Sequence, residues 1–64
     1  MNIEEAEANI GAEVVLVGPF HVKDVEKIII HTVGGSTVML NFYNKGERVG
    51  SACILPGYIA LKDK

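Results

Sequence analysis

The chain has little of what usually stabilises a small domain. Its 64 residues include a single cysteine, Cys53, so no internal disulfide can form. The uninterrupted apolar runs, such as those at residues 14–17 and 28–30, never exceed four residues. They are far shorter than the roughly 20 residues that a membrane-spanning helix needs. A disulfide framework and a membrane-spanning helix are therefore excluded.

The net charge is also small, and aromatic side chains are few. The formal net charge is −2 and aromatic residues make up 6% of the chain, so no strong electrostatic footprint of a nucleic-acid-binding protein is evident. Glu4, Glu5 and Glu7 stand where a signal peptide would carry its basic region. Together with the unpaired cysteine, these features indicate a cytoplasmic protein.

Apolar residues are plentiful, at 48% of the chain, which is incompatible with intrinsic disorder at this low net charge. The length leaves room for one core only, so we expect a single domain over residues 1–64. A domain of this size usually needs a disulfide, a metal or a partner subunit. Because some apolar side chains will not fit into one small core, we expect self-association or a protein partner.

The N-terminal segment has the pattern of a short helix over about residues 2–10. Asn2 is a favourable N-cap residue, and Ile3 and Ile10 lie on one apolar stripe. Gly11 is suited to end the helix in the left-handed conformation. A helix this short is marginal alone, so we expect Ile3 and Ile10 to dock on the rest of the domain.

After the helix, the apolar periodicity changes to that of strands separated by tight turns. Strands are predicted at residues 12–17, 25–33, 37–43, 48–54 and 58–61. Gly50 is predicted to mark a bulge or bend. A meander of this length can curl into a small half-open barrel over about residues 12–61, which limits exposed edges. The expected core is Ile10, Val14, Leu16, Val25, Ile28, Ile30, Val38, Leu40, Phe42 and Ile59.

Several short motifs follow one another in a familiar order. Gly11 precedes an apolar strand that ends in Gly18-Pro19-Phe20, and Leu55-Pro56-Gly57 precedes the last strand. In this order the chain resembles a small SH3-like barrel, and more loosely the KOW-motif modules of transcription elongation factors and ribosomal proteins. The resemblance covers about residues 11–62 and implies a mainly β, five-stranded, half-open barrel. The chain departs from the KOW pattern at Val25, where that family usually has a glycine, and in lacking a basic composition.

The candidates for chemistry are few. His21, His31 and Cys53 are the only soft metal ligands, and even with Asp24 their spacing matches no metal-site pattern. A Cys53–His–Asp24 nucleophile is formally possible, but Cys53 lies in an apolar strand and is expected to be buried and structural. The glycines at residues 34–36 lack a P-loop lysine and predict a hairpin turn. We therefore expect no catalytic residue, no metal and no cofactor.

These observations lead to three functional hypotheses. The first is a non-catalytic β-barrel module that binds a protein partner, or a second copy of itself, with apolar anchors and a rim arginine. The residues expected to form that surface are Phe20, Met39, Tyr43, Arg48 and Tyr58. The alternative is a KOW-like module that binds nucleic acid or the transcription or translation machinery through Lys23, Lys27, Lys45 and Arg48. The third is a subunit of an oligomeric enzyme, by analogy with plasmid-type dihydrofolate reductases, whose motifs the chain lacks.

Overall fold

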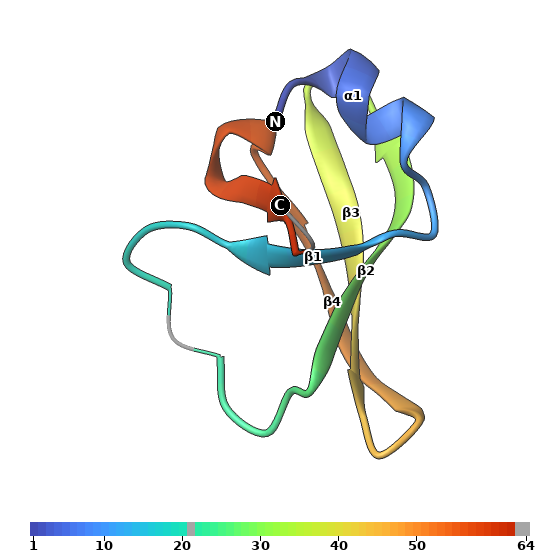
Figure 1. Ribbon diagram of the computed structural model, residues 1–64, viewed down its shortest axis with the longest axis vertical. Coiled ribbons are helices and arrows are strands. Elements are labelled where there is room, and N and C mark those ends of the chain that lie inside the picture. Colours follow the sequence, from blue (N-terminus) through green and yellow to red (C-terminus); the bar gives the residue numbers. More distant parts are fainter. Residues whose placement is uncertain (21, 63–64) are drawn as a thin grey trace.

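The computed structural model describes residues 1–20 and 22–62, and the chain is mainly β (Figure 1). Within these residues, five antiparallel strands form one sheet in the order β4-β3-β2-β1-β5. The strands are β1 (Glu13–Leu16), β2 (Lys27–Gly34), β3 (Thr37–Asn44), β4 (Glu47–Ile54) and β5 (Ile59–Leu61). Helix α1 (Ile3–Ala8) precedes them, and the 3₁₀ helix η1 (Pro56–Tyr58) joins β4 to β5. No helix of the described residues is long and apolar enough to cross a membrane.

Helix α1 begins as the sequence predicts and ends earlier. The Oδ1 atom of Asn2 accepts a hydrogen bond of 2.7 Å from the backbone N–H of Glu5, which is an N-cap. At the other end, Asn9 caps the helix, and its Nδ2 atom donates a 2.7 Å hydrogen bond to the carbonyl of Glu5. The chain then leaves the helix, which makes Ile10 exposed. The expectation that Ile10 is a core residue is therefore wrong, whereas the predicted docking of Ile3 is confirmed, and Ala6 joins it.

Two two-residue hairpin loops set the register of the central strands. Lys45 and Gly46 connect β3 to β4 with φ values of 54° and 81°, the left-handed pair of a type I′ turn. Gly35, with a φ of 59°, opens the loop between β2 and β3. The predicted hairpin turn at residues 34–36, with its need for positive φ, is thereby confirmed.

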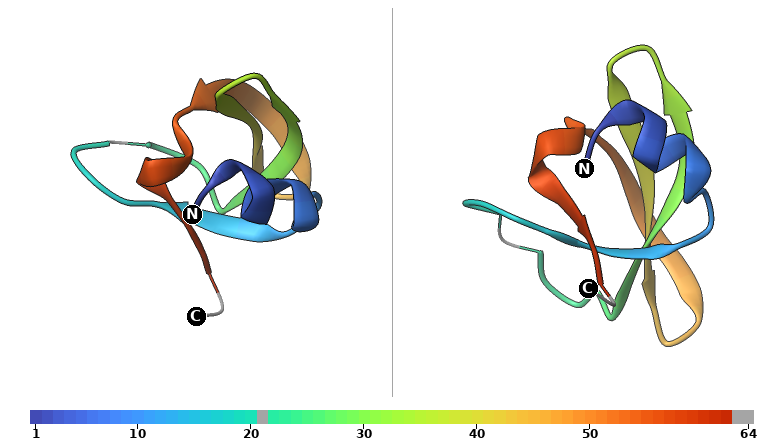
Figure 2. Two further views of the ribbon diagram at one scale, coloured as in Figure 1. Left: turned by 90° about the horizontal axis from the view of Figure 1, so that it is seen from above. Right: turned by 45° about the horizontal axis from the view of Figure 1, so that its top comes forward.

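The sheet curls around a small core. Strand β1 pairs with only the start of β2, at Glu13–Ile29 and Val14–Ile28, whereas β3 pairs with β2 along its whole length. As a result β1 runs across the direction of β2, β3 and β4 in Figure 1, and α1 packs against β2 and β3 (Figures 1 and 2). The fully buried side chains between these elements are Ala6, Val14, Ile30, Val38, Leu40 and Ile59.

The expected core is thus largely confirmed. Leu16, Ile28 and Phe42 are partly buried and pack against it. Val25 does not belong to it, because β2 begins only at Lys27 and Val25 lies half-buried in the preceding loop. The backbone bends at Asp24, which lies in the left-handed region with a φ of 57°, and bends again at Glu26, so no continuous strand runs from Val25 into β2.

Two bulges interrupt the pairing of the long strands. Phe42 pairs with Gly50 and Tyr43 pairs with Arg48, so Val49 is the extra residue of β4. The irregularity predicted at Gly50 is thereby confirmed. A second shift leaves His31 as the extra residue of β2, which the sequence did not predict.

Candidate protein-binding surfaces

Two aromatic side chains from distant parts of the chain meet on the surface. Phe20, in the loop between β1 and β2, and Tyr58, at the end of η1, contact each other edge to face. Their ring centroids are 5.3 Å apart and the ring planes make an angle of 72°. Both rings remain accessible, with 37% of Phe20 and 43% of Tyr58 exposed. The edge-to-face arrangement at this centroid distance is one that aromatic pairs prefer.

Backbone contacts fix the positions of both rings. The N–H of Val17 donates a 2.8 Å hydrogen bond to the carbonyl of Tyr58, which extends the pairing of β1 with β5 by one step. Gly18 then reverses the chain with a φ of 124°. A Cβ atom at Gly18 would lie 3.5 Å from a ring carbon of Phe20 and 3.5 Å from one of Tyr58. These are ordinary van der Waals distances, so the positive φ, and not a lack of space, favours glycine where the loop folds back and Phe20 reaches Tyr58.

Apolar side chains surround this pair. Val17 is exposed beside it, and we call Val17, Phe20 and Tyr58 the aromatic patch. A shallow cleft of about 300 Å³ continues from Phe20 between the loop and the sheet. Its lining includes the apolar Val15 and Val22. The residue types predict the two aromatic members of this patch but not the valines, whose exposure depends on where the loop leaves the sheet.

The other residues expected at the interface lie elsewhere. Met39 and Tyr43 belong to the outer face of the sheet, because the residues that alternate with them on β3, Val38, Leu40 and Phe42, face the core. Arg48 on β4 pairs with Tyr43 and shares that face. Figure 1 places the loop that carries Phe20 and the hairpin of β3 and β4 on different sides of the molecule. The expected single surface is therefore two surfaces.

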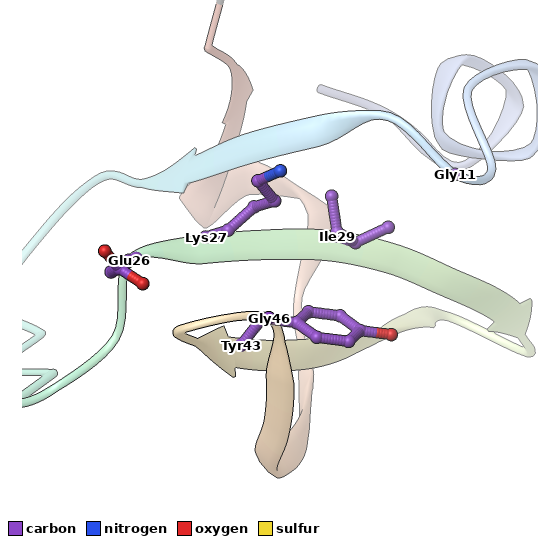
Figure 3. A pocket seen from close by; sticks show the side chains of 6 residues that line it. All are labelled: Gly11, Glu26, Lys27, Ile29, Tyr43 and Gly46. Atoms are coloured by element: carbon purple, nitrogen blue, oxygen red, sulfur yellow. The ribbon is translucent and has the colours of Figure 1, made fainter.

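Tyr43 lies between two cations on that outer face. Register pairs it with Lys27 on β2 and with Arg48 on β4. A groove of about 580 Å³ lies next to it (Figure 3). Figure 3 shows Lys27 and Ile29 side by side on β2, with the ring of Tyr43 along the neighbouring strand. The lining residues are Gly11, Glu26, Lys27, Ile29, Tyr43 and Gly46.

Two carboxylate residues, Glu26 and Glu47, lie among the basic residues around Tyr43. Lys45 lies in the adjacent hairpin turn, and its backbone N–H donates a hydrogen bond to the Oε1 atom of Glu26. The N–H of Glu26 donates a 2.8 Å hydrogen bond to the carbonyl of Tyr43. Glu47 is next to Arg48 in β4. Of the four basic residues expected to bind nucleic acid, three therefore gather here, and Lys23 lies apart in the loop before β2.

Among the described residues, the candidate metal ligands and the candidate nucleophile are not grouped into a site. Within residues 1–20 and 22–62, no three His, Cys, Asp or Glu side chains are grouped so that they could hold a metal ion. His21 lies outside the described residues. The expectation that Cys53 is buried is wrong, because it points from the outer face of the edge strand β4 into solvent.

Comparison with known proteins adds no relative. The chain matches no protein-family model, no curated protein and no solved structure.

Proposed function

We propose that this chain is a non-catalytic, SH3-like half-open barrel that binds a protein partner through the aromatic patch. The barrel is supported by the way β1 pairs with both β2 and β5 while crossing the direction of β2, β3 and β4. Strands β4 and β5 are the two edges of the sheet, which fits a barrel that stays open. We assign it to the cytoplasm, where an exposed free thiol such as Cys53 stays reduced.

The observation that carries this proposal is the exposed edge-to-face pair of Phe20 and Tyr58. Aromatic side chains are enriched among the residues that dominate protein–protein binding energy, because they bury a large area and lose little conformational entropy. The hydrogen bond from Val17 to Tyr58 and the contact between the rings already bring Phe20 and Tyr58 together without a partner. A partner that covers them therefore does not need to order them first.

A random-peptide display selection on the immobilised chain tests this function. We expect the selected peptides to bind the wild-type chain and to lose binding to Tyr58→Ala. Tyr43→Ala is the matched control, because it removes the other tyrosine, on the outer face of the sheet. The proposal is contradicted if the selection yields no peptide, or if the peptides bind Tyr58→Ala as tightly as the wild type.

A second candidate function is the binding of single-stranded nucleic acid at Tyr43. It is favoured by the row in which Tyr43 pairs with Lys27 on one side and Arg48 on the other. Such a row offers an aromatic ring for a base and two cations for the phosphates beside it. Filter binding of single-stranded RNA and DNA at two salt concentrations tests it. This candidate is supported if binding weakens as salt rises and weakens further in Arg48→Ala. It is contradicted if binding changes neither with salt nor in Arg48→Ala.

A further inference from the structure

Strand β4 is an edge of the sheet, and its two halves differ in how they are protected. Edge strands invite pairing with another chain unless charges, prolines or bulges prevent it. The first half of β4 has Glu47, Arg48 and the bulge at Val49. The second half, residues 50–54, has no charge, no proline and no bulge. This half is open to pairing with a further strand.

Residues 50–54 complement a second copy of themselves in size. In an antiparallel pairing about a two-fold axis at Ala52, Gly50 lies opposite Ile54 of the second copy, and Ser51 lies opposite its Cys53. Register within the chain puts Gly50, Ala52 and Ile54 on the inner side of β4. The bulky isoleucine thus faces a residue that has no side chain, at both ends of the pairing.

The same register brings together two exposed apolar side chains, Val49 and Leu55, that flank residues 50–54. Val49 is 56% exposed and Leu55 is 51% exposed. With the axis at Ala52, Val49 lies opposite Leu55 of the second copy, and the symmetry repeats this contact. Two apolar pairs therefore close the two ends of the pairing, where burial of exposed apolar area favours association.

Neighbouring registers lack this fit. An axis at Ser51 places Arg48 opposite Ile54 and Glu47 opposite Leu55, so charges would face apolar side chains. An axis at Cys53 brings Pro56, which has no N–H to donate, opposite Gly50. Within residues 50–54, where no bulge interrupts the alternation, only an axis that passes through a residue keeps inner residues opposite inner residues. Among these three registers, Ala52 is the centre without such a mismatch.

We propose that residues 50–54 form a dimer seam, in which β4 pairs antiparallel with β4 of a second copy about an axis at Ala52, with Val49 and Leu55 flanking the paired segment. The seam goes beyond the proposed function: it gives a place for the self-association that the size and apolar content predict, on a surface other than the aromatic patch. Because the seam is short, its area falls at the low end for specific complexes, and the dimer forms between about 10 µM and about 1 mM. Ten strands then form one sheet across the two copies.

Sedimentation equilibrium over that concentration range tests the seam. The wild-type mass rises with concentration from 6.9 kDa towards twice that value. The double variants V49E/L55E and V49K/L55K each place like charges opposite each other and stay monomeric. Their equimolar mixture restores the dimer, because each Glu now faces a Lys. The variant V49E/L55K carries the same number of new charges and dimerises alone.

Both substituted positions are exposed, so circular dichroism is expected to show unchanged folds. A second readout needs only one label on the natural Cys53, which is exposed. In the proposed register the two Cys53 Cα atoms lie about 8 Å apart, two residues along the strand and one strand across. Spin labels there broaden each other's spectra at high concentration, and the broadening disappears when unlabelled chain is added in excess.

Each result decides the proposal. A monomer at every concentration overturns the seam, as does a dimer that V49E/L55E leaves unchanged or a dimer without dipolar broadening. Tyr58→Ala separates the seam from the aromatic patch. If that variant dimerises like the wild type, the two surfaces act independently, whereas a dimer lost only in Tyr58→Ala places self-association on the aromatic patch and overturns the seam.

Discussion

Phe20 contacts Tyr58 edge to face across 5.3 Å between ring centroids, although one residue lies in the first long loop and the other ends the last helical turn. The pair therefore links the loop to the end of the chain. We expect the two residues to be energetically coupled by about 0.5–1.5 kcal/mol, beyond the loss of buried area. Urea unfolding of F20A, Y58A and the double variant measures this coupling. Additive effects would show that the rings are neighbours without mutual stabilisation.

Replacing a buried core residue is expected to lower the free energy of unfolding far more than replacing Ile10, which the sequence pattern places in the core but which is exposed. Leu40→Ala empties a fully buried site and is expected to lower the free energy of unfolding by about 2–5 kcal/mol. Ile10→Ala removes an exposed side chain and is expected to change it by less than about 0.5 kcal/mol. Thermal or urea unfolding checks both. A large loss for Ile10→Ala would mean that Ile10 packs as the sequence pattern suggested.

The N-cap of α1 gives a smaller and more specific effect. Asn2→Ala removes the acceptor of the hydrogen bond from the N–H of Glu5 and is expected to cost about 1 kcal/mol. Asn2→Asp keeps an acceptor at the same place and is the control, with little change expected. Equal losses of unfolding free energy in the two variants would show that this hydrogen bond does not stabilise α1.

Glycine is needed in the β3–β4 turn for its backbone conformation. Gly46 has a φ of 81°, and Gly46→Ala is expected to destabilise the fold by about 1–2 kcal/mol although open space surrounds the site. Gly57→Ala is the control, because that site is equally open and its φ lies outside the left-handed region. Urea midpoints of the two variants settle the comparison. A neutral Gly46→Ala would mean that the turn adopts another conformation.

Much of the fold follows from the sequence because local chemistry and burial agree. The alternation of Val38, Leu40 and Phe42 predicts the inner side of β3, and the glycines after β2 and β3 predict its two hairpins. The end of α1 was not predictable from the apolar stripe, which continues to Ile10. The helix ends earlier, at Asn9, whose side chain donates a hydrogen bond to the carbonyl of Glu5. The apolar Val25 likewise does not begin β2, because the chain bends at Asp24 and again at Glu26 before the strand starts.

The candidate site was only partly predictable. Aromatic identity singled out Phe20 and Tyr58, but their contact depends on tertiary pairing of β1 with the end of η1. Met39 and Tyr43 were grouped with them because the outer face of β3 alternates correctly, while nothing local shows that the loop lies on a different side. Cys53 looked buried by composition, and only the strand order makes β4 an edge with an exposed outer face.

The central claim is that the aromatic patch is the binding surface of this chain. Its most direct test is the affinity of a display-selected peptide for the wild type, Tyr58→Ala and Tyr43→Ala, measured by calorimetry. We predict that Tyr58→Ala weakens binding by about 30-fold or more, as expected for an aromatic anchor, and that Tyr43→Ala leaves it unchanged. Equal affinity for the wild type and Tyr58→Ala would contradict the account.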